Sequence, residues 1–205
     1  MKQPLQVLNI AKWSNNSVVN GPGARYVIWV QGCPILCPGC INPDLQPFIP
    51  AHKFTVEELS VNILNTDGIE GITISGGEPT CQAENLVPLF KIIRAHGLSI
   101  MCYSGYRLDE LRSSKKSSIQ EILTMIDILI DGPYMDEQAD GLPWRGSRNQ
   151  QVHFLSERYA DLASKIDQSK SLVEIKAGNF SWSMTGIWQN EFGARLEKEL
   201  NKKNN

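Results

Sequence analysis

The chain has 205 residues, of which 41% are hydrophobic and 20% are charged, and its formal net charge is −2. This length and composition suit one folded domain with an appendage. The small negative charge argues against a general nucleic-acid-binding surface, which needs an excess of Lys and Arg, so we expect no nucleic-acid partner.

The sequence also lacks the features of a membrane or secreted protein. No apolar run approaches the roughly 20 residues that span a bilayer, and the segment from Met1 to Pro4 lacks the apolar stretch of a signal peptide. We therefore expect a cytoplasmic protein with no membrane partner. Thiols stay reduced there, and clustered cysteines more often bind metal or do chemistry than form disulfides.

The first two thirds of the chain alternate between strand and helix patterns. A buried strand is predicted over residues 25–31, where β-branched and aromatic residues dominate, and capping-box spacing at Thr55 predicts a helix to about Asn65. Further strands are predicted at 71–75, 98–103 and 127–131, with helical patterns at 86–93 and 118–125 between them. This order indicates a parallel α/β sheet, either open or closed into a barrel.

The pattern weakens beyond residue 131. Residues 133–151 are rich in Gly, Pro, Arg and Asn and are predicted to form a long loop. The elements predicted after it are a strand at 152–155, a helix at 157–165, a strand at 172–176, an aromatic mixed segment at 180–187 and a charged helix from 190 to the end. We expect a core over residues 1–155 and a C-terminal extension over residues 156–205 that serves substrate or partner binding.

Unusual residues follow each of the first four predicted strands. A cysteine-rich segment follows the first strand, and Gly76, Gly77 and Glu78 follow the second. Ser104 follows the third strand and Asp131 ends the fourth. The carboxyl ends of parallel strands meet at one edge of a sheet, so we expect a functional site there.

Three of the five cysteines, Cys33, Cys37 and Cys40, lie within eight residues. Three thiolates leave one position of a metal centre open, as a catalytic metal requires. From the spacing alone, the alternative is a structural zinc site completed by a distant ligand such as His52. Cys81 and Cys102 are expected to be buried core thiols.

The remaining candidates each have a functional and a structural interpretation. Gly76 and Gly77 allow a ligand to approach the backbone closely, and Glu78 offers a carboxylate to a cationic group, but a plain turn is the alternative. Asp131 could bind a ribose hydroxyl or an ammonium group, or could cap a helix. His153 alternates with apolar residues and is expected to be structural.

Aromatic and cationic residues near the end of the chain are less specific. Arg145 and Arg148 lie in a polar loop that could seat a ligand carboxylate or a partner, or could be a solvated surface segment. Trp182 and Trp188 are expected to be core or interface residues.

The cysteine spacing, with Gly-Gly-Glu at 76–78, resembles the radical S-adenosylmethionine (SAM) superfamily. A closer resemblance, over about residues 20–155, is to the activating protein of anaerobic (class III) ribonucleotide reductase and related glycyl-radical activases. The segments that carry it are GPGARYVIWVQGCPILCPGCINPD, ITISGGEPT, YSGYRLDEL, DILIDGPY and WRGSRNQQVHFL. The resemblance implies a partial (β/α)6 barrel that is open on one side.

The resemblance also implies the cofactors and their ligands. A [4Fe-4S] cluster would be held by three cysteines, and the amino and carboxylate groups of SAM would bind its fourth iron. The implied cluster ligands are Cys33, Cys37 and Cys40, and the implied SAM contacts are Gly76, Gly77, Glu78, Ser104 and Asp131. An electron donor such as flavodoxin or ferredoxin would drive cleavage of SAM to a 5′-deoxyadenosyl radical, which takes hydrogen from a protein or peptide substrate. No catalytic side chain beyond these ligands is implied.

Three functions stay open at this point. The resemblance favours an activase that makes a glycyl radical on a partner enzyme. The extension beyond the resembling part raises the alternative of an enzyme that modifies a ribosomally made peptide. A non-catalytic iron–sulfur or zinc protein is the third.

Overall fold

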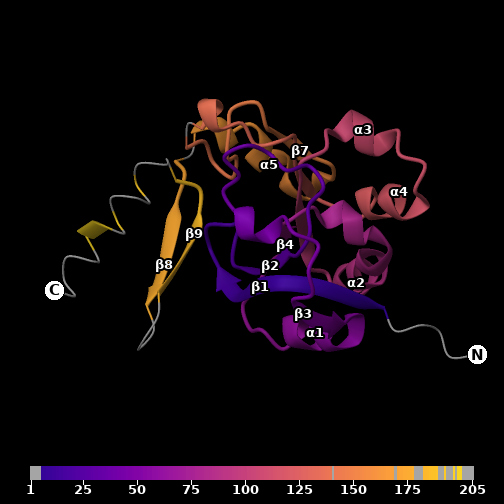
Figure 1. Cartoon of the computed structure of the whole chain (residues 1–205). Helices are drawn as coiled ribbons and strands as arrows, with labels where there is room; N and C mark the ends of the chain where they lie inside the picture. Colours follow the sequence, from indigo (N-terminus) through magenta and orange to yellow (C-terminus); the bar gives the residue numbers. More distant parts are fainter. Residues whose placement is uncertain are drawn as a thin grey trace, which may run out of the picture.

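The structure, a computed structural model, describes residues 6–139, 141–168, 170–177 and 182–188, with single residues 192, 196, 198 and 199. A seven-stranded sheet of order β3-β1-β2-β4-β5-β6-β7 lies at its centre, and β8 and β9 form a separate hairpin (Figure 1). The large sheet consists of β1 (Val7–Ser17), β2 (Arg25–Val30), β3 (His52–Thr55), β4 (Gly71–Gly76), β5 (Ser99–Ser104), β6 (Ile128–Asp131) and β7 (Gln151–Phe154). The other elements are β8 (Val173–Ala177), β9 (Trp182–Gly186), α1 (Val56–Leu64), α2 (Ala83–Ala95), α3 (Leu108–Arg112), α4 (Ser117–Leu123) and α5 (Ala160–Ala163).

The middle of the sheet is parallel and its margins are antiparallel. Strands β2, β4, β5 and β6 run parallel to one another. Strands β1 and β3 extend the sheet antiparallel on one side, and β7 does so on the other. The predicted α/β class and its parallel strands are confirmed, and the sheet that carries them is open and mixed.

Helices cover one face of this sheet. The main core, between the sheet and helices α1, α2 and α4, includes Ile28, Ile74, Phe90 and Ile122. On the other face smaller clusters form around Trp29 and, farther along the sheet, around Met101, Ile128 and Ile130. Every residue of β2 is buried because both faces are covered there.

The local signals for α1 and α2 act as expected. Thr55 Oγ1 accepts a hydrogen bond from Glu58 N at 3.1 Å, and Glu58 Oε2 accepts one from Thr55 N at 2.9 Å, which completes the predicted capping box. Gly97 follows α2 with a φ of +75°, a conformation that glycine adopts without strain. No helix among the described residues is long and apolar enough to cross a membrane.

Two strands of the large sheet were not predicted. The first half of β1 alternates, with Leu8 and Ile10 buried, but its second half is polar and its pairing with β2 shifts register between Ile10 and Lys12. Strand β3 has four residues, too few for a periodic pattern. Strand β1 is stabilised by its pairing with β2, and β3 is stabilised by its pairing with β1, because the local propensity of both strands is weak.

The C-terminal predictions were less accurate. The helix predicted at 157–165 is a 3₁₀ turn at Glu157–Tyr159 followed by the short α5. The strand predicted at 172–176 is β8, and its partner β9 lies in the segment that we predicted only as aromatic and mixed. Most of the charged helix predicted from residue 190 lies outside the described residues.

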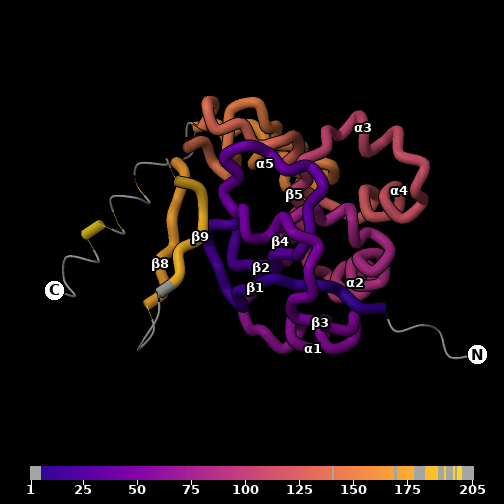
Figure 2. The backbone as a smooth tube through the Cα atoms, in the orientation of Figure 1, coloured from indigo at the N-terminus to yellow at the C-terminus, as the bar shows by residue number. Residues whose placement is uncertain are grey.

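The hairpin β8–β9 lies beside the amino-terminal part of the large sheet (Figure 2). Lys176 Nζ donates a hydrogen bond to Ser14 Oγ at 2.9 Å, and Asn20 Nδ2 donates one to Thr185 Oγ1 at 3.0 Å. These contacts join segments that are more than 150 residues apart in the sequence, so the hairpin packs beside β1 and the segment that follows it.

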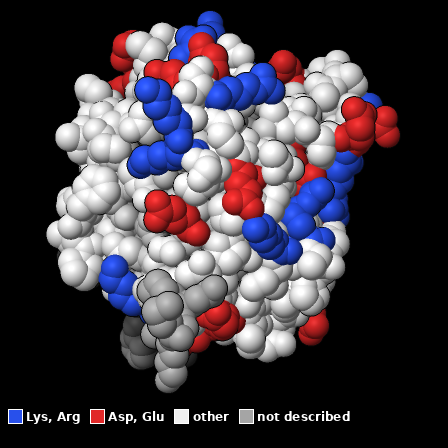
Figure 3. Space-filling model, turned by 90° about the vertical axis from the view of Figure 1, so that its right-hand side faces the viewer, with Lys and Arg blue, Asp and Glu red and all other residues white. Residues whose placement is uncertain are grey.

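The face that carries α2, α3 and α4 is charged but mixed in sign. Figure 3 shows Lys and Arg side chains interspersed with Asp and Glu across this face. One pair there, Lys91 and Glu121, joins α2 to α4 with an Nζ to Oε1 distance of 2.7 Å. Both side chains are solvent-exposed, so this pair contributes little to stability.

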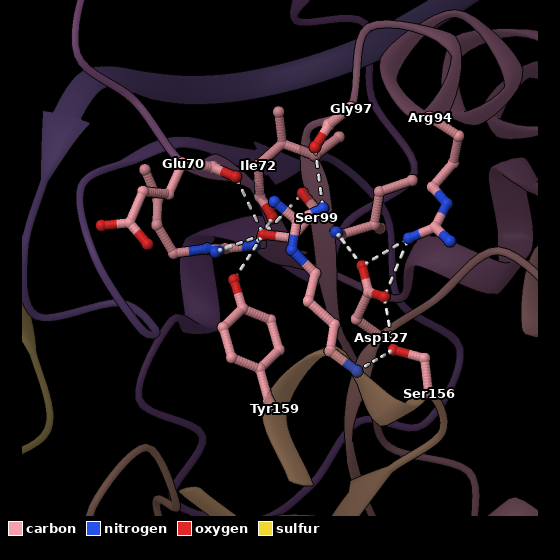
Figure 4. A network of polar contacts seen from close by, with 11 residues as sticks. Glu70, Ile72, Arg94, Gly97, Ser99, Asp127, Ser156 and Tyr159 are labelled. Atoms are coloured by element: carbon pink, nitrogen blue, oxygen red, sulfur yellow. Dashed lines mark hydrogen bonds and ion pairs between the residues drawn. The ribbon is translucent and has the colours of Figure 1, made fainter. Parts of the chain in front are cut away.

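A buried arginine ties the amino ends of three parallel strands together. Arg25 is 0% exposed, and its guanidinium donates to Thr73 Oγ1 at 2.7 Å, to Ser99 Oγ at 2.9 Å and to the Ile72 carbonyl. Figure 4 shows Ser99 between Glu70 and Tyr159; the Tyr159 hydroxyl donates to Ser99 Oγ at 2.8 Å. The network therefore also fixes the segment after β7.

Asp127 extends this network at the start of β6. It accepts hydrogen bonds from Arg94 Nη1 at 2.8 Å, from Ile100 N at 2.9 Å and from Ser156 Oγ at 2.6 Å (Figure 4). These donors come from α2, β5 and the chain after β7, so one carboxylate joins three parts of the fold.

We predict that Arg25→Lys lowers the free energy of unfolding by about 2–4 kcal/mol, because an ammonium group cannot reach all the acceptors of the guanidinium and leaves some of them unpaired. Urea denaturation measures this change. Arg112→Lys on the exposed side of α3 is the control and should change stability by less than about 0.5 kcal/mol. Equal stability of the Arg25 variant and the wild type would contradict the prediction.

Candidate active site

A cavity opens at the carboxyl ends of the parallel strands, on the sheet face that the helices leave free. It encloses about 1000 Å³ of atom-free space, its open mouth included. Most residues that we predicted for the site line it: Cys33, Cys37, Cys40, Gly76, Gly77, Glu78 and Ser104. The structure therefore brings these residues together at one cavity, and their role as a functional site stays a prediction.

The cysteine loop, residues 31–42, follows β2, and its three cysteines line this cavity. Backbone hydrogen bonds from Gly32 N to Leu45 O (2.9 Å) and from Cys33 N to Gln46 O (2.8 Å) hold its start, and Leu36 and Gly39 adopt positive φ values of 53° and 69°. All three thiols are free and partly exposed. Their donor chemistry fits an iron–sulfur cluster.

The thiols are not yet gathered around one point. In the part of the chain that the structure describes, no three His, Cys, Asp or Glu side chains are close enough together to hold a metal ion. Burial raises the pKa of the Cys33 thiol, and backbone groups of Ile35 and Leu36 lower it in part. Binding of a cluster would therefore have to draw the loop together and remove thiol protons.

Gly76 and Gly77 bring the end of β4 against the cysteine loop. A Cβ at Gly77 would lie 2.3 Å from the Gly32 carbonyl oxygen, and a Cβ at Gly76 would lie 2.5 Å from Val30 N. Their place is secured by hydrogen bonds from Gly77 N to Val30 O and from Glu78 N to Gly32 O, both 2.8 Å. Any larger residue at either position would push the two segments apart.

Glu78 is 1% exposed, and its carboxylate is fully engaged within the protein. Oε1 accepts from Thr80 N (3.0 Å), Thr80 Oγ1 (2.7 Å) and Ser104 Oγ (3.0 Å), while Oε2 accepts from Gly105 N (2.8 Å). Burial raises the pKa of Glu78, and these four donors oppose that rise. Glu78 thus joins the end of β4 to the end of β5 at the cavity wall.

Asp131 pairs with Ser104 in the register of the sheet, but it does not line the main cavity. Its Oδ2 accepts a hydrogen bond from Leu108 N at 2.5 Å and lies 2.9 Å from His153 Nε2. It lines a second cavity with Arg107 and Arg112, and only the adjacent Gly132 reaches the main cavity. The contact with Leu108 N is that of the helix cap we named as the alternative, and the structural role of His153 stays a prediction.

The other side chains proposed for ligand contact lie outside the main cavity. Arg145 forms an ion pair with Asp167, and neither Arg145 nor Arg148 lines the cavity. His52 packs edge-on against Trp13, with ring centroids 5.3 Å apart, and does not reach the cysteines' cavity either. The zinc alternative therefore lacks the fourth ligand suggested for it.

The two remaining cysteines differ from each other. Cys102 is buried in the main core, as predicted. Cys81 is exposed, and the prediction that it is a core thiol was wrong. It lies in the 3₁₀ turn Pro79–Gln82 directly after Glu78, where Pro79 and Thr80 occupy the buried positions.

Several cavity residues were missed from the sequence. Lys12, Asn20, Trp29 and Asn42 line the cavity, and so does the end of the hairpin, residues 184–188, where Thr185 contacts Asn20. Trp29 could have been predicted, because it lies two residues after Val27 on the same strand. The two side chains therefore share the sheet face that the helices leave free. Lys12 lies in β1 and residues 184–186 lie in β9, two strands that the sequence did not reveal. Trp188, expected in a core or interface, lines the cavity.

Comparison with known proteins places this site in a family. The sequence matches the family described as "4Fe-4S single cluster domain" over residues 19–153. The chain belongs to this family of iron–sulfur proteins.

Its relatives make the family more specific. The anaerobic ribonucleoside-triphosphate reductase-activating protein of Escherichia coli is 36% identical over 158 residues, which cover 72% of this chain and 99% of that protein. The protein of the same name from Haemophilus influenzae is 35% identical, over 71% of this chain and 97% of its own length. The chain thus belongs with these activating proteins, and the predicted radical SAM membership, enzymatic nature, [4Fe-4S] cluster and SAM are confirmed.

A solved structure, that of QueE from Escherichia coli, has a TM-score of 0.37 and 18% identity over 48% of this chain and 52% of its own. This likeness is too low to carry a structural argument.

We predict that Glu78→Gln lowers the free energy of unfolding by about 1–3 kcal/mol, because the amide NH₂ would face donors that now have an acceptor. Chemical denaturation of the cluster-free protein measures this effect separately from any loss of cofactor. Glu84→Gln, at an exposed position of α2, is the matched control and should be near neutral. A Glu78 variant as stable as this control would show that the four contacts are dispensable.

Proposed function

We propose that this enzyme is an activase that takes a hydrogen atom from a glycine of a partner enzyme. One observation carries the proposal: three free thiols, the Gly-Gly-Glu segment and Ser104 line a single cavity at the ends of the parallel strands, in a chain related to activating proteins. The partial (β/α)6 barrel remains part of this proposal, and the order β2-β4-β5-β6 supports it.

The proposed cluster ligands are Cys33, Cys37 and Cys40. When bound, the cluster supplies one electron for reductive cleavage of SAM to a 5′-deoxyadenosyl radical. Gly76, Gly77 and Ser104 are proposed to contact SAM, Gly76 and Gly77 through backbone groups. Glu78 would act mainly by holding these groups in position, because its own carboxylate already has four donors. A direct SAM contact by Asp131 stays a prediction.

The walls of the cavity would shield the 5′-deoxyadenosyl radical from water and from unwanted hydrogen donors. Trp29 and Tyr103 line it from the sheet, and Ile35 and Ile41 line it from the cysteine loop. Apolar walls exclude water and unwanted hydrogen donors, which matters because such a radical reacts with what lies near it. Flavodoxin or ferredoxin is the proposed electron donor, and the cytoplasm is the proposed location.

We also propose that residues 156–205 form a separate extension that contributes to substrate choice. The family match ends at residue 153, whereas Met184, Ile187 and Trp188 line the cavity. Hydrogen bonds between Asn20 and Thr185 hold this wall against the amino-terminal segment. A substrate group that enters would therefore contact side chains from beyond the matched region.

This wall supports a second candidate function, modification of a ribosomally made peptide. An activase must admit a loop of a large folded partner, and an added wall restricts the mouth of the cavity to slender segments. The two candidates share the cofactor chemistry and differ only in the substrate.

We expect Cys37→Ala to abolish cluster assembly, because two remaining thiols cannot hold the cluster in the cavity. Iron analysis after anaerobic reconstitution should fall from about four irons per chain to a trace, and 5′-deoxyadenosine should not form. Cys81→Ala is the matched control, since that thiol is exposed and outside the cavity, and it should retain iron and cleavage. A Cys37 variant with full iron content would remove Cys37 from the ligand set.

The substrate is tested by offering both classes to the reconstituted enzyme. We expect a glycyl-radical signal by electron paramagnetic resonance when an anaerobic ribonucleotide reductase is incubated with the enzyme, SAM and a reductant. Mass spectrometry of coexpressed short peptides tests the second candidate. A modified peptide together with a silent reductase would replace the activase proposal with peptide tailoring.

A further inference from the structure

Lys12 brings a positive charge to the site cavity from β1, a strand that the sequence did not predict. It lies on β1 opposite Trp29 in the pairing register, and its Nζ is 5.1 Å from the centroid of the Trp29 ring. Nζ also lies 3.5 Å from Asn42 Oδ1. Asn42 is two residues beyond Cys40, so the ammonium group sits beside the end of the cysteine loop.

The charges around the cavity make this position distinctive. Among the described residues that line it, Lys12 is the one cation and Glu78 is the one acid. Glu78 is occupied by its four donors, and no ion pair joins Lys12 to an acid in the described part of the chain. Lys12 therefore faces the cavity with a charge that no residue lining it neutralises.

A bound carboxylate would complete this arrangement. SAM carries one carboxylate, which the family resemblance implies would bind the fourth iron of the cluster. The proposed cluster ligands lie on the loop that ends beside the Lys12 ammonium. Arg145 and Arg148, the cations that the sequence suggested for this role, do not line the cavity. Partial burial lowers the pKa of Lys12 and Asp44 raises it in part, and an anion at the site would favour the charged form further.

We propose that Lys12 binds the carboxylate of SAM, with the Trp29 ring as a platform and Asn42 as a second contact that orients the ammonium group. This inference rests on the proposed function, because it requires SAM in this cavity. It assigns to β1, a strand that antiparallel pairing adds to the parallel core, a part in cofactor binding.

The test compares SAM with decarboxylated SAM, which keeps the sulfonium, the amine and the adenosine but lacks the carboxylate. Equilibrium dialysis against the reconstituted holoenzyme under argon, without reductant, gives Kd for each. We expect Lys12→Met to raise the Kd of SAM about tenfold, the value of one charge-assisted hydrogen bond at a partly exposed site, and to leave the Kd of decarboxylated SAM unchanged. Lys12→Arg should retain most of the affinity.

Lys53→Met is the matched control, because Lys53 is an exposed lysine on the neighbouring strand β3 and lines none of the cavities described above. An unchanged Kd of SAM in Lys12→Met would overturn the proposal. An equal rise in the Kd of SAM and of decarboxylated SAM would also overturn it, because it would indicate a structural role for Lys12. Failure of the SAM chemistry that both candidate functions share is distinguishable, since the wild-type holoenzyme would then not bind SAM at all, and the choice of substrate does not affect this test. Circular dichroism and iron content confirm that each variant is folded and loaded.

Discussion

Glu78 carries a negative charge into a nearly dry position at the point where two parallel strands end. Such burial is unfavourable unless hydrogen bonds compensate for the lost water, and here Thr80, Ser104 and Gly105 supply them. The carboxylate thereby fixes the spacing of β4 and β5 at the cavity wall. The cysteine loop depends on the same spacing, because Glu78 N is bonded to Gly32 O immediately before Cys33.

The opposite end of the sheet has a complementary arrangement. Arg25 places a buried cation at the amino ends of the strands. Its hydrogen-bond acceptors in the described part of the chain are hydroxyl and carbonyl oxygens, and none of them is a carboxylate. An open sheet lacks the continuous hydrogen bonding that keeps a closed barrel in register. Buried polar groups at both ends of the parallel strands supply part of that constraint here.

The sequence predicted those parts whose signals are local. Residues 25–30 and 128–131 are strongly apolar, and the glycines beside Glu78 mark a close approach of backbone segments, so the parallel strands and most of the cavity wall could be placed. Lys12 could not, since its strand is polar in its second half and depends on pairing with β2. Asp131 has the same neighbours in sequence whether it caps a helix or meets a ligand, and only the position of Leu108 N distinguishes the two.

The position of the hairpin β8–β9 has a consequence for how the protein is made. The cysteine loop and the Gly-Gly-Glu turn precede residues 184–188 in the sequence, so they leave the ribosome before the hairpin does. The wall that residues 184–188 supply can therefore be added to the cavity only after the cysteine loop and the Gly-Gly-Glu turn have been synthesised. Iron delivered to the growing chain would meet thiols without that wall, and iron delivered to the finished chain would have to pass it.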